Sequence, residues 1–344
     1  MKNIWLDHKA AVSFTVIGLL AALLLGWQEQ GTLSHALEVF FICSVLAVLE
    51  ISLSFDNAIV NARILKNMSP IWQRRFLTFG IIIAVFLMRI VFPIAVVCFS
   101  AWIDPWSALK LAIFDGQRYG EILAESHISI AAFGGTFLLM VSLNYFLDPS
   151  KEVFWLKWIE KPISFLGNVK YISVVIAFLC ILIFYSQIAI SEQQKFLVCS
   201  IYGLLTFLVV EAIGDLLHSQ ESTMQNVQKA GAGAFLYLEI LDASFSFDGV
   251  IGAFALSKNL FIIALGLGIG AFYVRSMTIA LVKRETLARY CYLEHGAFYA
   301  IFLLAITMYL QTITHISEYI TGLVGVVFIL LAFLASVKEN KRQA

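Results

Sequence analysis

The feature that most constrains this chain is its succession of long apolar segments. Most are close to the roughly 20 residues that a helix needs to cross a bilayer. Hydrophobic residues make up 60% of the sequence and charged residues only 13%, whereas a soluble domain has about 25% charged residues. We therefore predict an all-α, polytopic membrane protein with about ten transmembrane helices. The predicted spans are 10–27, 35–60, 76–101, 129–147, 169–190, 195–218, 232–256, 259–282, 293–312 and 316–337.

The basic residues of the connecting loops are unevenly distributed. When alternate loops are assigned to alternate sides, seventeen Lys and Arg fall on one side and four on the other. Cytoplasmic loops carry this excess, so we expect both termini in the cytoplasm. The segment 151–165 mixes lysines with Phe and Trp, which is typical of an amphipathic helix lying on the membrane surface. The formal net charge is zero, so nothing indicates nucleic-acid binding.

A motif near the end of the second span returns in the seventh. Ser54-Phe55-Asp56-Asn57 matches Ser246-Phe247-Asp248-Gly249, and an acid lies six residues before each aspartate, at Glu50 and Asp242. In the following spans, Gly80 precedes Arg89 by nine residues, as Gly266 precedes Arg275. The ordered series of matches across three spans indicates an internal duplication.

The two copies are five spans apart, an odd number, so the duplication predicts two inverted-topology repeats. This is the architecture of many secondary transporters, whose substrate site lies near the midplane between the repeats. We expect a first half at 1–190, with a repeat core at 35–147, and a second half at 191–344, with a core at 232–312.

Seven carboxylates fall inside predicted spans. Such charges cost at least about 2.5–3.5 kcal/mol at the bilayer centre and persist where they face a polar cavity, pair or bind an ion. They are Glu50, Asp56, Glu211, Asp215, Glu239, Asp242 and Asp248.

On an ideal helix Glu50 and Asp56 would point about 120° apart. We expect a local helix break at 51–57, and a matching one around Ser244, Ser246 and Gly249, because Ser, Asp and Asn compete for backbone hydrogen bonds. Carboxylate and freed carbonyl oxygens would suit Mn²⁺, Ca²⁺ or Mg²⁺. The predicted metal ligands among these carboxylates are Glu50, Asp56, Glu239, Asp242 and Asp248.

Other charged residues have simpler interpretations. Arg89 and Arg275 are the only basic residues well inside spans, and we expect them to neutralise carboxylates as structural ion-pair partners. Glu211 and Asp215 share one helix face and form a possible proton or ion pathway, or else a polar helix end at the membrane surface.

The two motifs, Glu50-Ile-Ser-Leu-Ser-Phe-Asp56-Asn57 and Asp242-Ala-Ser-Phe-Ser-Phe-Asp248-Gly249, resemble those of the TerC-like integral membrane family. The resemblance covers roughly 35–147 and 232–335. It implies a multi-pass protein of the bacterial cytoplasmic (inner) membrane, within a transporter superfamily that includes lysine exporters, and links to Mn²⁺ export and tellurite resistance. By position, the resemblance also implies metal-site residues at Glu50, Asp56, Asn57, Asp242 and Asp248. Gly249 replaces the Asn57 of the first motif, which is a departure from that pattern.

The leading hypothesis is a secondary transporter that exports a divalent cation, Mn²⁺ before Ca²⁺, perhaps by exchange for protons. No Walker motif is visible, so we do not expect the protein to use ATP. No nucleophile–base pair or HExxH motif is visible either, so we expect that the protein is not an enzyme and has no permanently bound cofactor. The expected partners are membrane lipid and the metal ion. The alternatives are an exporter of a cationic amino acid or other small solute, and a non-transporting membrane scaffold.

Overall fold

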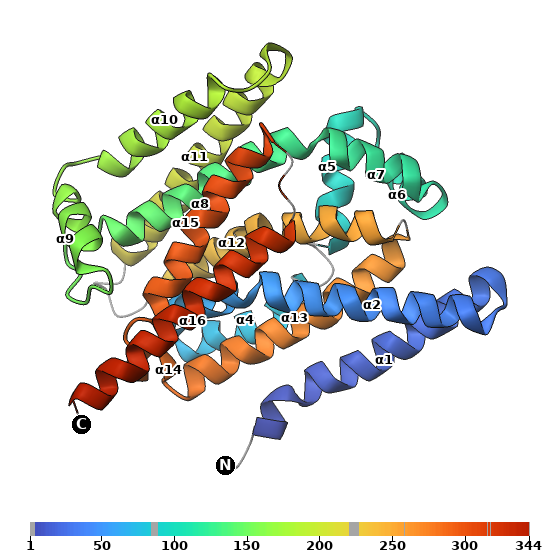
Figure 1. Ribbon diagram of the computed structural model, residues 1–344, viewed down its shortest axis with the longest axis horizontal. Coiled ribbons are helices and arrows are strands. Elements are labelled where there is room, and N and C mark those ends of the chain that lie inside the picture. Colours follow the sequence, from blue (N-terminus) through green and yellow to red (C-terminus); the bar gives the residue numbers. More distant parts are fainter. Residues whose placement is uncertain are drawn as a thin grey trace.

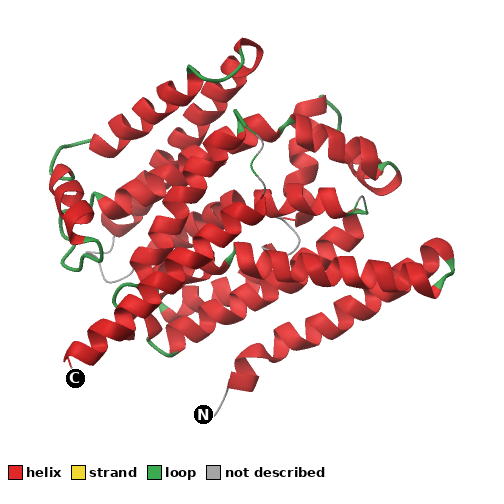
Figure 2. Cartoon of the chain, in the orientation of Figure 1, coloured by secondary structure: helices red, strands yellow, loops and turns green. Residues whose placement is uncertain are grey.

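The computed structural model describes residues 4–83, 89–219, 227–257, 259–314, 316 and 318–343, and all regular structure in these ranges is helical (Figures 1 and 2). The predicted all-α class is therefore confirmed. The helices are α1 Ile4–Gln30, α2 Leu33–Leu53, α3 Phe55–Lys66, α4 Pro70–Ile82, α5 Phe92–Ala101, α6 Pro105–Phe114, α7 Gly116–Glu125, α8 His127–Phe146, α9 Lys157–Leu166, α10 Ile172–Tyr185, α11 Ile190–Ser219, α12 Val227–Leu256, α13 Leu260–Lys283, α14 Thr286–Arg289, α15 Leu293–Gln311 and α16 Glu318–Gln343.

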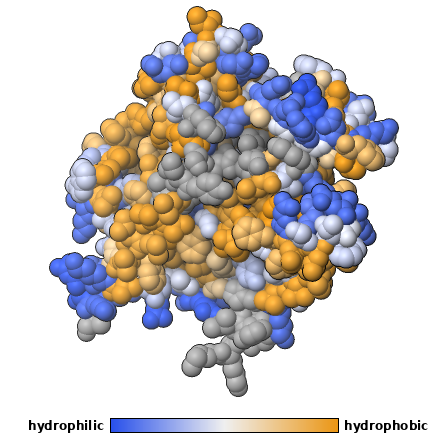
Figure 3. All heavy atoms as spheres, turned by 45° about the vertical axis from the view of Figure 1, so that its right-hand side comes forward, coloured by the Kyte–Doolittle hydropathy of each residue, from blue (hydrophilic) through white to orange (hydrophobic). Residues whose placement is uncertain are grey.

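Within the described residues, six helices are long and apolar enough to cross a membrane. They lie in α1, α2, α8, α11, α13 and α15. The other predicted spans also contain helix, but α10 has only 14 residues and α12 carries the three carboxylates of the second motif region. Hydrophobic side chains cover much of the face in Figure 3, with hydrophilic ones gathered toward its margins.

The predicted second span is broken where the first motif lies. Helix α2 ends at Leu53, Ser54 has non-helical dihedral angles, and α3 begins at Phe55. The expected break at 51–57 is therefore confirmed. The matching break predicted in the second motif is wrong, because α12 continues without interruption through the corresponding residues. Eight residues of α3 are buried, so this half-helix lies inside the bundle.

The two motif regions lie side by side and run antiparallel. The carboxylate of Glu50 lies against Gly249, where an added Cβ would be 3.1 Å from Oε2. Further along the chain, Asn57 and Asn61 contact Asp242. As residue numbers increase along α2 and α3, the numbers of the contacted residues in α12 decrease, so the two segments are antiparallel.

Two other helix pairs run parallel and approach closely at glycines. On α13, Gly266 lies against Leu46 of α2, and Gly270 lies one turn further on against Glu50. On α4, Gly80 lies against Glu239 of α12, while Gly231 of α12 lies against Trp72. Small residues at these crossings let the helix backbones approach, as is common in membrane proteins.

The remaining helices surround this centre (Figure 1). Segment 101–128, left without an assigned structure by the sequence, forms α6 and α7, and the buried Tyr119 and Leu123 of α7 pack beneath α12. Segment 151–165 contains α9, which exposes Trp158 and Phe165 on one face and buries Glu160 on the other. Helix α9 is therefore amphipathic, and its location on the membrane surface stays a prediction.

The α2–α13 packing gives a testable expectation. Gly266→Ala places its Cβ 2.6 Å from Leu46 Cβ and 3.0 Å from the Cys43 carbonyl oxygen, so we expect destabilisation of about 1–3 kcal/mol from overpacking. Gly325→Ala is the matched control, because its nearest neighbour is 3.6 Å away. That control should be neutral or stabilising by up to about 1 kcal/mol, since alanine favours helix. Thermal unfolding in detergent compares the two, and equal melting temperatures would contradict the packing.

Candidate functional site

Glu50 sits at the end of α2 with partners that neutralise it. The hydroxyl of Ser54, at the break itself, donates to Glu50 Oε1 over 2.9 Å. Arg89 forms an ion pair with the same oxygen, and all three side chains are buried. Ser54 follows Glu50 by four residues, so the two side chains share one face of the helix up to the break.

Asp242 of α12 is held by two amides from the other half of the chain. Asn57 donates to Asp242 Oδ1 over 2.6 Å, and Asn61 donates to the same oxygen over 3.0 Å. The side-chain oxygens of both asparagines are buried and have no hydrogen-bond partner among the described residues. A buried acceptor without a partner is costly, so these two oxygens are free to accept a hydrogen bond or bind a cation.

Glu239 lies one turn before Asp242 and close enough to interact with it electrostatically. Both Glu239 oxygens are buried without a hydrogen-bond partner in the described structure. Arg275 borders the same glycine, Gly80, as Glu239, yet its guanidinium donates to the Phe76 carbonyl and stacks on the Phe76 ring. Arg275 therefore balances the local charge of Glu239 and Asp242 without a recorded direct bond to either.

The remaining predicted ligands are less fully described. Asp56 is buried at the start of α3 and accepts a hydrogen bond from the backbone N–H of Asn57 over 2.9 Å. The side chain of Asp248 lies outside the described residues, as does that of Asp215. Among the described residues, no three His, Cys, Asp or Glu side chains are grouped closely enough to hold a metal ion.

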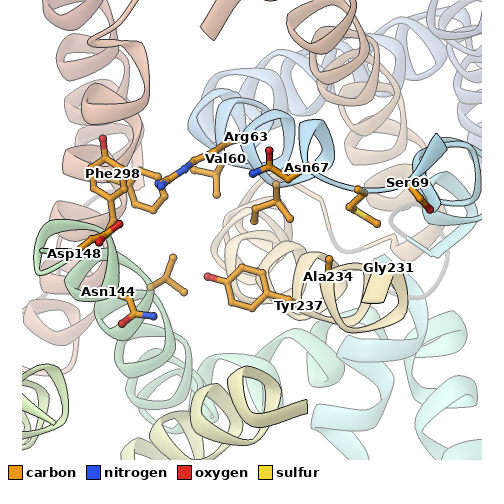
Figure 4. Close-up of a pocket in the computed structure, with 14 residues that line it drawn as sticks. Val60, Arg63, Asn67, Ser69, Asn144, Asp148, Gly231, Ala234, Tyr237 and Phe298 are labelled. Carbon is orange, nitrogen blue, oxygen red and sulfur yellow. The ribbon is translucent and has the colours of Figure 1, made fainter. Parts of the chain in front are cut away.

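A cavity of about 580 Å³ lies beside the Asp242 contacts, because Val60 and Ile64, which flank Asn61 on α3, line it. Figure 4 shows Val60 and Arg63 of α3, and Asn67 directly after this helix, on one side of the cavity. They face Ala234 and Tyr237 of α12 on the other side. The wall is completed by α8 and α15 and by the loops that follow α3 and α8. The cavity carries polar groups at its rim and apolar ones between the helices. Its further lining residues include Ser69, Asn144, Tyr145, Asp148 and Phe298.

A second cavity, of about 470 Å³, lies beyond Asn144 and Asp148, which line both cavities. Glu211 lines this second cavity and accepts a hydrogen bond from Asn144 over 2.7 Å. The predicted Glu211 pathway residue therefore borders a cavity. The structure brings Glu211 to Asn144 and records no contact of Glu211 with the carboxylates around Asp242.

The sequence analysis missed a buried ionic cluster beneath α9. Glu160 accepts from Lys151 over 2.9 Å and from the backbone N–H groups of Trp155 and Leu156, and His295 lies 3.3 Å away. Burial lowers the pKa of Lys151, although the Glu160 hydrogen bond opposes this. The signal in the sequence was the Glu160 in the first turn of an amphipathic helix, a position that attracts backbone N–H groups. This cluster fixes α9 against α15.

Asn61 was also missed. It lies one helical turn after Asn57 on α3, which puts both amides on one face. That spacing could have identified it once a helix was assumed to start after Ser54.

The long apolar helices and the polar groups enclosed between them define an all-helical membrane protein. A family model described as "Protein of unknown function (DUF475)" matches residues 55–343, and the chain belongs to this family. No curated protein and no solved structure matches the chain.

The Glu50–Arg89 pair can be tested directly. Arg89→Ala leaves a buried carboxylate without its counter-charge, so we expect a loss of about 3–5 kcal/mol of stability. Arg118→Ala is the control, because the Arg118–Glu121 pair is about half exposed and such pairs are worth at most about 1 kcal/mol. Unfolding in detergent measures both, and similar small losses would show that Glu50 does not depend on Arg89.

Proposed function

We propose that this protein is a secondary transporter that moves a divalent cation, most simply Mn²⁺, through the buried polar groups between α3 and α12. One observation carries the proposal. Asp242 is bound by Asn57 and Asn61, which lie about 180 residues earlier in the chain, and amide oxygens beside it are left without partners. Two sequence regions that share a motif thus meet at a carboxylate inside an apolar bundle.

The proposed architecture is that of two inverted repeats with ten spans. In the repeat, Glu50 corresponds to Asp242 and Asn57 corresponds to Gly249. The contact of Asn57 with Asp242 is therefore the counterpart of the contact of Gly249 with Glu50. Such reciprocity is expected of elements related by a two-fold axis. The antiparallel course of α2–α3 and α12 supports the same arrangement.

The chemistry of the site favours a small, hard cation. The available ligands are carboxylate and amide oxygens, which suit Mn²⁺, Ca²⁺ or Mg²⁺. The two buried arginines are held by Glu50 and by the Phe76 carbonyl and ring. No three described acids are grouped closely enough to hold a metal by themselves, so the proposed ligands are the Asp242 carboxylate and the side-chain oxygens of Asn57 and Asn61 beside it. The unpartnered oxygens of Glu239 make it a further candidate ligand.

The proposal extends to the coupling mechanism. Carboxylates in a low-dielectric interior are costly to ionise together, so some hold protons when no cation is bound. An arriving divalent cation stabilises the ionised forms and releases those protons. Metal/proton antiport follows from this exchange. We also propose that the protein is TerC-like, that it lies in the bacterial inner membrane and that it works as an exporter.

Uptake into inverted vesicles tests the function. We expect uptake of Mn²⁺ above that of Ca²⁺, Mg²⁺ and lysine, and we expect Asp242→Asn to reduce it about tenfold or more, since even the outer partners of a metal are worth about 10–100-fold in affinity. The control is Glu121→Gln, which changes an exposed carboxylate. Uptake of lysine in preference to all three metals would replace the cation with an amino acid, and no uptake of any of them would overturn the proposal.

A further inference from the structure

The hydrogen bonds to Asp242 lie at the end of the large cavity that is nearer to Glu50. On α3, Val60 and Ile64 line the cavity and flank Asn61, whereas Asn57 and Ser54 precede them. On α12, Tyr237 lines the cavity, and Asp242 follows five residues later, about 7.5 Å along the helix. The bonds from Asn57 and Asn61 to Asp242, here called the amide clasp, therefore lie between the cavity and the Ser54–Glu50 region.

Both asparagines of the amide clasp could form further hydrogen bonds through their side-chain oxygens. Each asparagine donates its N–H to Asp242 while its own oxygen stays buried without a partner in the described structure. Asn57 is 5% exposed and Asn61 is 2% exposed, so neither oxygen is open to bulk solvent. A side-chain amide can present either its N–H groups or its oxygen to the same point by rotating about its terminal bond. This makes it a reversible partner for a carboxylate and for a cation.

The clasp exists in only one of the two motif regions. The positions that correspond to Asn57 and Asn61 in the second motif are Gly249 and Ala253, which carry no polar side chain. Glu50, the counterpart of Asp242, is neutralised by Arg89 instead. A rotating amide is therefore available on the cavity side of Asp242 and has no equivalent beside Glu50.

We propose that the amide clasp is the gate between the cavity and the Ser54–Glu50 region, and that Asn61 is also a ligand of the transported cation. In the closed form the N–H groups of both asparagines hold Asp242. When a hard divalent cation enters from the cavity, it takes their place on Asp242, and the amides rotate to offer their oxygens. This inference rests on the proposed transport function, but its gating part can be tested without transport.

Cysteine labelling tests the gate. The five native cysteines are replaced by alanine, and one reporter is introduced at a time: Ala234→Cys inside the cavity or Ser54→Cys beyond the clasp. A membrane-impermeant thiol reagent is applied to inside-out and right-side-out vesicles. We expect Ala234→Cys to react from one side, and Ser54→Cys to react about tenfold more slowly from that side. Adding Asn61→Ala should accelerate the Ser54→Cys reaction about tenfold, the effect of losing one hydrogen bond to a charged group.

Two controls keep the result specific. The rate at Ala234→Cys should not change with Asn61→Ala, which shows that the variant is folded and the cavity intact. Asn144→Ala removes another cavity amide, one bonded to Glu211 rather than Asp242, and should leave the Ser54→Cys rate unchanged. An unchanged rate with Asn61→Ala, or an equal acceleration with Asn144→Ala, would overturn the gate.

The ligand role of Asn61 is tested by Mn²⁺ protection of the Ser54→Cys reporter. Asn61→Asp keeps a side-chain oxygen but cannot donate to Asp242, whereas Asn61→Leu removes both functions. We expect Mn²⁺ to slow labelling in Asn61→Asp and to have no such effect in Asn61→Leu. Equal protection in both would remove Asn61 from the ligand set. A wild-type protein that transports no ion would count against the proposed function alone, because labelling without metal does not depend on transport.

Discussion

The structure depends on how carboxylates are kept inside an apolar bundle. A charge at the bilayer centre costs at least about 2.5–3.5 kcal/mol, so polar partners that neutralise or bond such groups stabilise the bundle. Glu50 receives Arg89 and the hydroxyl of Ser54, and Asp242 receives two amides. These contacts join α2, α3 and α12, and the surrounding helices bury them.

The partners reach the carboxylates because the helices are locally unusual. The break at Ser54 starts a new helix whose first turns carry Asp56 and Asn57 and are buried on most sides. Glycines at the α2–α13 and α4–α12 crossings let Glu50 and Glu239 lie directly against a neighbouring helix. Larger residues there would push those helices apart and leave the charges without their surroundings. The apolar packing and the polar site are therefore parts of one arrangement.

Much of this could be predicted from the sequence, for identifiable reasons. Long apolar runs fix helix positions because the bilayer imposes a length, and the Ser, Asp and Asn residues of the first motif indicated its break. The break predicted in the second motif was wrong. The hydroxyl of Ser244 donates to the Ile240 carbonyl, and α12 stays continuous there. Local residue type alone did not distinguish the two cases.

The ion-pair partner of Glu50 was among the candidates, but the amide partners of Asp242 depend on tertiary contacts, so Asn61 was not identified. The clusters around Glu160 and Tyr119 were missed for the same reason: burial of these residues is decided by how the short helices α9 and α7 fold back onto the bundle.

Binding of a divalent cation in exchange for protons is the property proposed for the carboxylates around Asp242. Calorimetric titration of the purified protein with Mn²⁺, in buffers of different ionisation enthalpy, measures binding and proton release together. We expect saturable binding with proton release, an affinity that falls as the pH is lowered, and loss of both in Asp242→Asn while the protein remains folded. Saturable binding that is unchanged in Asp242→Asn, or no saturable binding by the wild-type protein, would contradict it.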